Sequence, residues 1–141
     1  MRRWIVLAAV ALGVVTLSVA AGAADKKMPM AKPVTIEGTL IDTKCYSMSA
    51  VNKTNDHMTP DGTKVACAAA CAKMGIPVAL LTSKGEVVVI LAPAPVFKDH
   101  MAHLARVTGV KAYKGTAIVP DKTEVKGEDG TWIEISTREM M

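Results

Sequence analysis

The chain has 141 residues, of which 17 are lysine or arginine and 13 are aspartate or glutamate, giving a formal net charge of +4. Only 4% of the residues are aromatic, so the chain lacks the stacking side chains of a nucleic-acid-binding surface. Two of the basic residues, Arg2 and Arg3, stand in a segment that we expect to be removed, and the remainder is nearly neutral. We therefore expect no nucleic-acid partner.

The first 24 residues have the features of a secretory signal peptide. Arg2 and Arg3 form a basic start, residues 5–20 are apolar without a charge, and residues 21–24 (AGAA) provide a small-residue cleavage site. We interpret residues 1–24 as a signal peptide and expect a periplasmic or secreted mature protein. The alternative is an uncleaved membrane anchor, because this segment is long enough to span a bilayer. In the first interpretation, contact with the membrane is limited to the signal segment before cleavage.

One domain is expected after the signal peptide. Residues 25–33 (DKKMPMAKP) contain two prolines and have the composition of a flexible leader. Residues 34–141 are enough for a single domain with a modest core. Within it, Val34, Ile36 and Leu40 alternate with polar residues, which predicts a half-buried strand that ends near Asp42.

An insertion, residues 45–75, follows this strand. It is polar and rich in turn residues as far as residue 62, and residues 64–74 are alanine-rich and therefore predicted to be helical. Gly75 and Pro77 end the predicted helix. All three cysteines of the chain lie in this insertion.

The rest of the chain predicts mainly strands. Residues 78–82 and 86–92 are apolar, β-branched runs separated by Ser-Lys-Gly, which is typical of a hairpin. Residues 96–107 carry apolar side chains at helical spacing, and residues 110–119 and 131–137 resemble two further strands. The apolar positions of that helix are Phe97, Met101, Leu104 and Val107, and residues 123–126 can extend the strand of 110–119.

This order of elements predicts a mainly β fold. Five strands with a helix between the third and the fourth is the connectivity of a small OB-fold-like barrel. The helix-containing insertion after the first strand would then carry the cysteines and His57. A barrel of this kind hosts many unrelated sites, so the fold alone does not predict a function.

The insertion combines residues that bind metals. An odd number of cysteines leaves at least one sulfur without a disulfide partner inside the chain, which points to a metal, a free thiol or an intermolecular bridge. On a helix, Cys67 and Cys71 project from one face with Cβ atoms about 6 Å apart, whereas a disulfide needs about 3.8 Å. Two such thiolates can bind one ion, and Cys45 and His57 can complete a four-coordinate set.

Two other interpretations of the cysteines stay open. Cys45 can form a disulfide with Cys67 or Cys71 that ties the insertion to the barrel, or one thiol can take part in redox chemistry. The metal itself is open as well. Three thiolates and an imidazole suit zinc, but thiolates with thioethers select cuprous copper, and three methionines lie in the insertion: Met48, Met58 and Met74.

Further motifs for catalysis or metal binding are weak. The chain has no G-x-S-x-G elbow, no G-x-x-x-x-G-K-[ST] phosphate loop and no H-E-x-x-H helix, so a binding module is favoured over an enzyme. His100 and His103 form an H-x-x-H pair. His100 falls among the apolar positions of the predicted helix, where a hydrogen-bonded core histidine is the more common situation.

The sequence resembles a group of small exported bacterial proteins of uncharacterised function. The resemblance rests on GTLIDTKCY, a following histidine, CAAACAKMGIPVALLTSKGEVVVIL and the later VKAYKGTAIV segment. It implies an OB-fold-like β-barrel with a cysteine- and histidine-bearing insertion, and it implies no activity. It marks Cys45, His57, Cys67 and Cys71 as the site residues, with Gly75 and Pro77 as structural companions.

Together these patterns predict an exported monomer that binds zinc or copper through Cys45, Cys67, Cys71 and His57, for storage, delivery or structural order. The expected partners are the metal ion and a protein of the cell envelope. The first alternative is a disulfide-stabilised binding module of the envelope without metal. The least favoured alternative is a thiol redox protein.

Overall fold

The computed structural model of the protein describes residues 31–58 and 61–137. The signal peptide expected at residues 1–24 lies outside the described residues, as does most of the leader expected at 25–33. In the described ranges, no helix is both long enough and apolar enough to cross a membrane.

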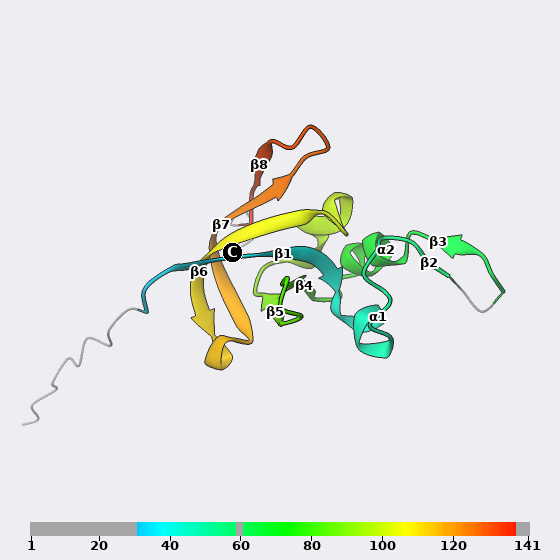
Figure 1. Cartoon of the computed structure of the whole chain (residues 1–141), viewed down its shortest axis with the longest axis horizontal. Helices are drawn as coiled ribbons and strands as arrows, with labels where there is room; N and C mark the ends of the chain where they lie inside the picture. The colour runs from blue at the N-terminus through cyan, green and yellow to red at the C-terminus, as the bar shows by residue number, and fades with distance from the viewer. Residues whose placement is uncertain (1–30, 59–60, 138–141) are drawn as a thin grey trace, which may run out of the picture.

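A sheet of six strands dominates the structure (Figure 1). Its strand order is β5-β4-β1-β6-β7-β8, and β5 also pairs with β7, which closes a ring of five strands. The pairing of β5 with β7 is parallel, whereas the other neighbours are antiparallel. The expectation of a mainly β, barrel-like fold is confirmed. The strands are β1 (Val34–Asp42), β4 (Val78–Leu81), β5 (Val87–Ile90), β6 (Leu104–Ala112), β7 (Ala117–Lys126) and β8 (Trp132–Ile135).

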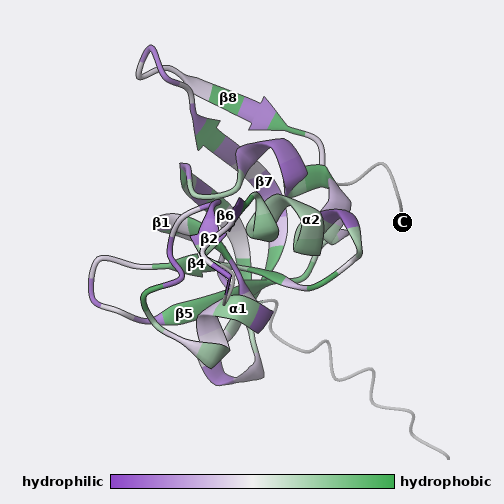
Figure 2. Ribbon diagram, turned by 90° about the vertical axis from the view of Figure 1, so that its right-hand side faces the viewer, coloured by the Kyte–Doolittle hydropathy of each residue, from purple (hydrophilic) through white to green (hydrophobic). Residues whose placement is uncertain are grey.

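The hydrophobic core joins the ring to the helices beside it. Phe97, from the 3-10 helix η1 (Ala94–His100), is completely buried, as are Leu40 of β1 and Val107 of β6. Helix α2 (Cys67–Lys73) adds Ala68 and Ala72 to the same cluster. Figure 2 shows that β5 and α2 are predominantly hydrophobic. The insertion is therefore anchored to the ring by the alanine face of α2.

Gly109 allows β6 and β7 to approach each other closely. The register of this pair shifts between Thr108 and Gly109, and a Cβ atom at Gly109 would collide with the carbonyl oxygen of Val119. A bulge increases the local twist of a strand, which helps a sheet of few strands to close on itself. Any side chain at position 109 would force the two backbones apart.

The helix expected at residues 96–107 is wrong beyond His100. The chain forms the short helix η1, turns at Ala102 with a positive φ of 68°, and enters β6 at Leu104. Burial along β6 alternates with a period of two, and its β-branched residues favour an extended backbone. The helical spacing of the apolar residues arises because η1 and β6 both face the core.

The strand expected at residues 110–119 is also wrong as a single element. It comprises the end of β6, the tight turn η2 (Tyr113–Gly115) and the start of β7. Three successive residues, Tyr113, Lys114 and Gly115, have positive φ values, so the chain reverses there. The hairpin expected from residues 78–92 is confirmed as β4 and β5, and β8 lies within the strand expected at 131–137.

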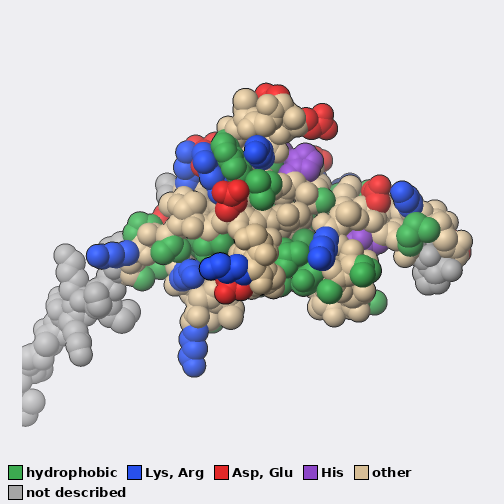
Figure 3. Space-filling view, viewed as in Figure 1, with side chains coloured by type: hydrophobic (Ala, Val, Ile, Leu, Met, Phe, Trp, Pro, Cys, Tyr) green, Lys and Arg blue, Asp and Glu red, His purple; other side chains and the backbone are tan. Residues whose placement is uncertain are grey.

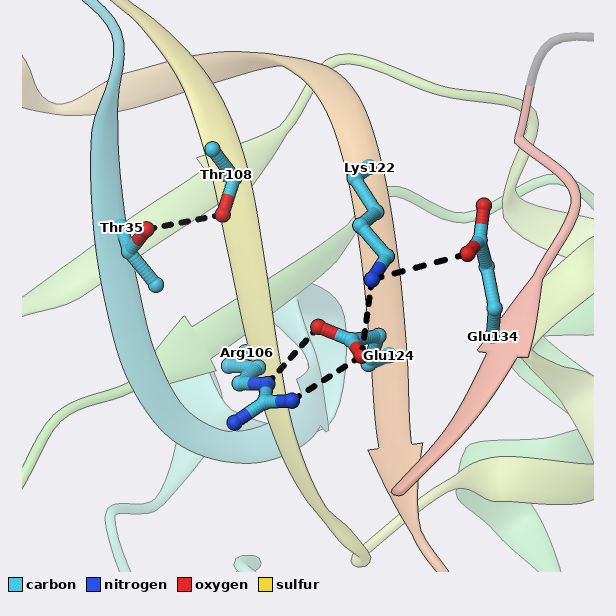
Figure 4. A network of polar contacts seen from close by, with 6 residues as sticks. All are labelled: Thr35, Arg106, Thr108, Lys122, Glu124 and Glu134. Carbon is cyan, nitrogen blue, oxygen red and sulfur yellow. Dashed lines mark hydrogen bonds and ion pairs between the residues drawn. The ribbon is translucent and has the colours of Figure 1, made fainter.

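A polar network fixes β8 to the ring (Figure 4). Arg106 donates two hydrogen bonds to Glu124, at 2.7 and 3.0 Å, and Lys122 donates a third at 3.0 Å. Lys122 also lies 3.6 Å from Glu134 of β8, and the Arg106 guanidinium stacks 4.3 Å from the ring centroid of Trp132. The hydrogen bonds from Arg106 and Lys122 hold the pKa of Glu124 at about 2.

Candidate metal centre

The site begins where β1 leaves the ring. Asp42, the last residue of β1, caps the short helix α1 (Thr43–Met48): its Oδ1 accepts a hydrogen bond from the backbone N–H of Cys45 at 2.8 Å. An aspartate is a preferred residue at this position because its oxygen satisfies a helix N–H that has no backbone partner. This hydrogen bond therefore fixes Cys45 in the first turn of α1, directly after the end of a core strand.

Asn55 caps helix α2 from a distant part of the chain. The residue at the start of this helix, Ala66, provides no side-chain cap. Instead, the carbonyl oxygen of Asn55 accepts from Ala68 N–H at 3.2 Å, and its side-chain oxygen accepts from Ala69 N–H at 3.0 Å. These bonds hold the segment just before His57 against the first turn of α2, where Cys67 stands. This segment also donates a hydrogen bond from Asn52 to the carbonyl oxygen of Cys45 at 2.9 Å.

The insertion thereby gathers the ligand-type side chains. His57 begins strand β2 (His57–Met58), which pairs with β3 (Lys64–Val65) in a small separate sheet (Figure 1). The ligand atoms of Cys45, His57 and Cys67 lie within 4.8 Å of one another, and so do those of Asp42, Cys45 and Cys71. Cys45 is common to both groups and therefore lies between them.

All three cysteines are free thiols. The Sγ atoms of Cys45 and Cys67 are 3.5 Å apart, whereas the sulfurs of a disulfide are separated by about 2.05 Å. Two metal-bound thiolates need a separation of this order, because each lies about 2.3 Å from a shared zinc ion. The observed spacing needs only a modest widening to hold an ion between the two sulfurs.

One ring nitrogen of His57 has no hydrogen-bond partner. The side chain is 8% exposed, and its Nε2 lies 2.9 Å from the carbonyl oxygen of Thr54. A carbonyl oxygen can only accept, so Nε2 carries the proton and Nδ1 carries the lone pair. Nδ1 is buried and has no hydrogen-bond partner. Metal-binding histidines commonly donate the second ring N–H to a backbone carbonyl in this manner.

Asp42 carries a second acceptor without a partner. Its side chain is 1% exposed, and while Oδ1 caps α1, Oδ2 makes no hydrogen bond. A buried acceptor left without a partner costs about 1–3 kcal/mol. The cluster therefore contains two buried acceptors, one from His57 and one from Asp42, beside three thiols. A cation held by Cys45, His57 and Cys67 would satisfy the first acceptor, and one held by Asp42, Cys45 and Cys71 would satisfy the second.

The surroundings of Cys45 and Cys71 raise the pKa of both thiols. Burial raises the pKa of Cys45, with further contributions from the hydrogen bond to Cys67 and the charge of Asp42. Burial and the charge of Asp42 raise the pKa of Cys71 as well. A redox-active cysteine requires the opposite shift, because the thiolate is the nucleophile. The environment of these two thiols is therefore unlike that of a thiol oxidoreductase, and a metal would have to displace their protons.

The four residues expected as ligands lie in one cluster, and Asp42 joins them. Cys67 and Cys71, which were expected on one helix face, interact through their side chains, and each also forms a group with Cys45. Asp42 was not expected as a ligand. The feature of the sequence that could have identified Asp42 is its position three residues before Cys45, at the end of a core strand.

The two remaining histidines lie apart from this cluster. His100 ends η1 and is half-buried. Its burial lowers the pKa of the imidazole, and the charge of His103 lowers it further. Among the described residues, neither histidine joins two other ligand-type side chains at metal-binding distance. The H-x-x-H pair therefore does not form a second centre there.

A groove at the other end of β1 gives no clear indication of a ligand. It has a volume of about 510 Å³ and lies between the start of β1, the β4–β5 turn and η2. Its charged lining is mixed: Lys84, Lys111 and Lys114 face Glu37 and Glu86. The cysteine cluster remains the better-defined candidate site.

No protein-family model matches this chain, and no curated protein or solved structure does. The chemical interpretation therefore rests on the geometry of the cluster itself.

Proposed function

We propose that this protein is an exported module that binds one soft transition-metal ion, for storage, delivery or structural order. The observation that carries the proposal is the pair of buried acceptors, His57 Nδ1 and Asp42 Oδ2, beside three free thiols. Without a cation this arrangement is costly to fold, because neither acceptor has a partner. The signal-peptide pattern of residues 1–24 supports export.

The chemistry of the donor set fits zinc or cuprous copper. Thiolate and imidazole ligands suit Zn²⁺, and thiolates also bind Cu(I) strongly. Cys45, Cys67 and His57 would form three positions of the coordination sphere. Cys71 or Asp42 would complete it from the other side of Cys45. Each thiol would lose a proton to solvent on binding, so uptake of the ion releases protons.

A disulfide-stabilised envelope module is the second candidate. The 3.5 Å separation of Cys45 and Cys67 is the observation that favours it, because an oxidising compartment can join two thiols so placed. The reaction removes two protons and two electrons, which an external thiol oxidant would accept. It would leave Cys71 as a single thiol and remove two metal ligands.

Metal content and thiol count distinguish the two candidates. The mature protein would be purified from the periplasm without chelator, and its thiols counted after anaerobic denaturation in EDTA. One equivalent of zinc or copper together with three thiols supports the metal module. Absence of metal together with one thiol would contradict the proposal and favour the disulfide module.

Serine variants then test the arrangement of the ligands. Because Cys45 belongs to both groups, Cys45→Ser should lower metal affinity more than Cys71→Ser, which leaves the group of Cys45, His57 and Cys67 intact. Competition with a chromogenic chelator measures both affinities. Equal affinities in Cys71→Ser and the wild-type protein would remove Cys71 from the site, and no loss in Cys45→Ser would contradict the proposed centre.

A further inference from the structure

Methionine is distributed unevenly in the described part of the chain. Met101 is 4% exposed and belongs to the core. Met48, Met58 and Met74 are 77%, 63% and 70% exposed. Burial of a methionine side chain would contribute about 1.5–3 kcal/mol to folding, and these three do not supply that stabilisation. Packing in the core therefore does not account for these three methionines.

Each exposed methionine belongs to an element that carries a candidate ligand. Met48 follows Cys45 by three residues on α1, and Met74 follows Cys71 by three at the end of α2. Side chains three residues apart lie on neighbouring turns of the same helix face. Met58 directly follows His57 in β2. Each thioether is therefore within three residues of a candidate ligand in the sequence and is exposed at the surface of the same insertion.

The same region concentrates exposed apolar side chains. Besides the three methionines, Val51 and Val65 of the insertion are 80% and 39% exposed. Figure 3 shows hydrophobic side chains on this part of the surface, at the right of the view. Exposed apolar residues that cluster in this way indicate a binding surface more often than residues scattered singly.

We propose that Met48, Met58 and Met74 capture Cu(I) and pass it to the thiols of the cluster, so that cuprous copper is the ion this protein carries. This inference rests on the proposed metal-binding function. Thioethers are soft, neutral ligands that select Cu(I) and bind zinc poorly. They lose no proton on binding, so they can accept the ion at the surface before any thiol is deprotonated.

Transfer from the surface to the buried site is a ligand exchange. Bonds between thioether sulfur and Cu(I) break, bonds between thiolate sulfur and Cu(I) form, and each thiol that binds releases one proton to solvent. The copper remains Cu(I), and no electron is transferred. The buried nitrogen of His57, which has no hydrogen-bond partner, is available as a further ligand at the end of this route.

The charge of the insertion favours capture of Cu(I) by thioethers over electrostatic attraction of a divalent cation. Residues 45–75 contain three lysines and two aspartates, so the surface around the cluster is not negative. Attraction of Zn²⁺ to an entrance of this kind would be weak, because long-range steering requires opposite charge. Thioether sulfur atoms can coordinate Cu(I) even where the surface potential is not negative.

Leucine variants separate metal capture from apolar docking. Met→Leu substitutions nearly conserve volume and hydrophobicity but remove the sulfur atom. The triple variant Met48→Leu, Met58→Leu, Met74→Leu would retain a docking surface for a partner protein and lose the thioethers. Met101→Leu, in the core, is the matched control.

The experiment follows Cu(I) transfer from its bicinchoninate complex to the mature, reduced protein in an anaerobic stopped-flow instrument. We expect the triple variant to slow the transfer at least about tenfold, the lower end of the effects seen when groups around a metal site are removed. The control should transfer at the wild-type rate. Zinc uptake should be the same in all three proteins, which shows that the buried site is folded.

The outcomes distinguish this inference from the proposed function on which it rests. Equal rates for the triple variant and the wild-type protein would overturn the methionine route, as would a wild-type protein that binds zinc but takes no Cu(I). In both cases the metal-binding function stands. A wild-type protein that binds neither ion overturns both proposals.

Discussion

Replacement of Asp42 by asparagine should move stability and metal affinity in opposite directions. In the metal-free protein the carboxylate is 1% exposed, and its Oδ2 has no hydrogen-bond partner. An asparagine keeps the oxygen that accepts from Cys45 N–H at 2.8 Å and removes the buried charge. If the role of Asp42 is to bind metal, the metal-free wild-type protein should be less stable than the metal-free Asp42→Asn variant.

The magnitude follows from three contributions. Relief of the unpartnered acceptor is worth about 1–3 kcal/mol. Loss of a negative charge at the N-terminus of α1 costs about 0.3–1 kcal/mol. The new amide N–H groups would face sulfur atoms, which are weak acceptors, so the lower part of the range applies. We expect a net gain of about 1 kcal/mol in the free energy of unfolding, or roughly 4 °C in Tm for a domain of this size.

Metal binding should respond with the opposite sign. Loss of the carboxylate should weaken affinity by about 10–100-fold, the effect typical of groups that hold or orient a metal ligand. Thermal denaturation with and without one equivalent of metal measures both quantities on one sample. Asp56→Asn is the matched control, because Asp56 is exposed in the same insertion and should change neither quantity. A metal-free Asp42→Asn protein that is less stable and binds metal with unchanged affinity would show that Asp42 is only a helix cap.

Three further variants test the supports of the site and the ring. Asn55→Ala removes the side-chain cap of α2 and should cost about 1 kcal/mol in thermal unfolding, with weaker metal binding because His57 loses its placement; unchanged affinity would contradict that role. Glu124, whose pKa is lowered from 4.5 to about 2, stabilises the fold above pH 4.5, and this stabilisation disappears as the pH falls toward 2. Urea denaturation of Glu124→Gln should therefore show a shallower loss of stability over that pH range, and a curve parallel to the wild type would refute the role of the ion pairs. Gly109→Ala should destabilise the ring by about 1–3 kcal/mol, because the new Cβ meets the Val119 carbonyl, and an unchanged urea midpoint would show that β6 and β7 can separate freely.

Local patterns in the sequence predicted much of the sheet. The alternation of residues 34–42 and the β-branched runs of residues 78–92 correspond to β1, β4 and β5, because period-two burial and side-chain branching act within a few residues. The same kind of reasoning was wrong for residues 96–107. Apolar residues spaced three and four apart also arise where a 3-10 helix and a strand pack successively on one core, as η1 and β6 do.

The composition of the candidate site was likewise visible in the sequence. Three cysteines and a histidine in one insertion predicted a shared cluster, and the structure brings the other three residues close to Cys45. Helical spacing predicted that Cys67 and Cys71 lie on one side of their helix, and their side chains interact there, but spacing describes only the side on which a residue lies. The direction in which the sulfur points, and the groups that it meets, depend on the neighbouring segments.

Tertiary structure alone decided how the site is completed. The parallel pairing of β5 with β7 closes the ring, and Asn55 holds the His57 segment against α2 through hydrogen bonds to residues 13 and 14 positions away. Contacts over such separations leave no periodic trace in the sequence. The sequence by itself determined which ligand types are present and that they share one insertion. Their burial, and with it the unpartnered acceptors of Asp42 and His57, exists only in the folded chain, because only packing removes the water that would otherwise satisfy them.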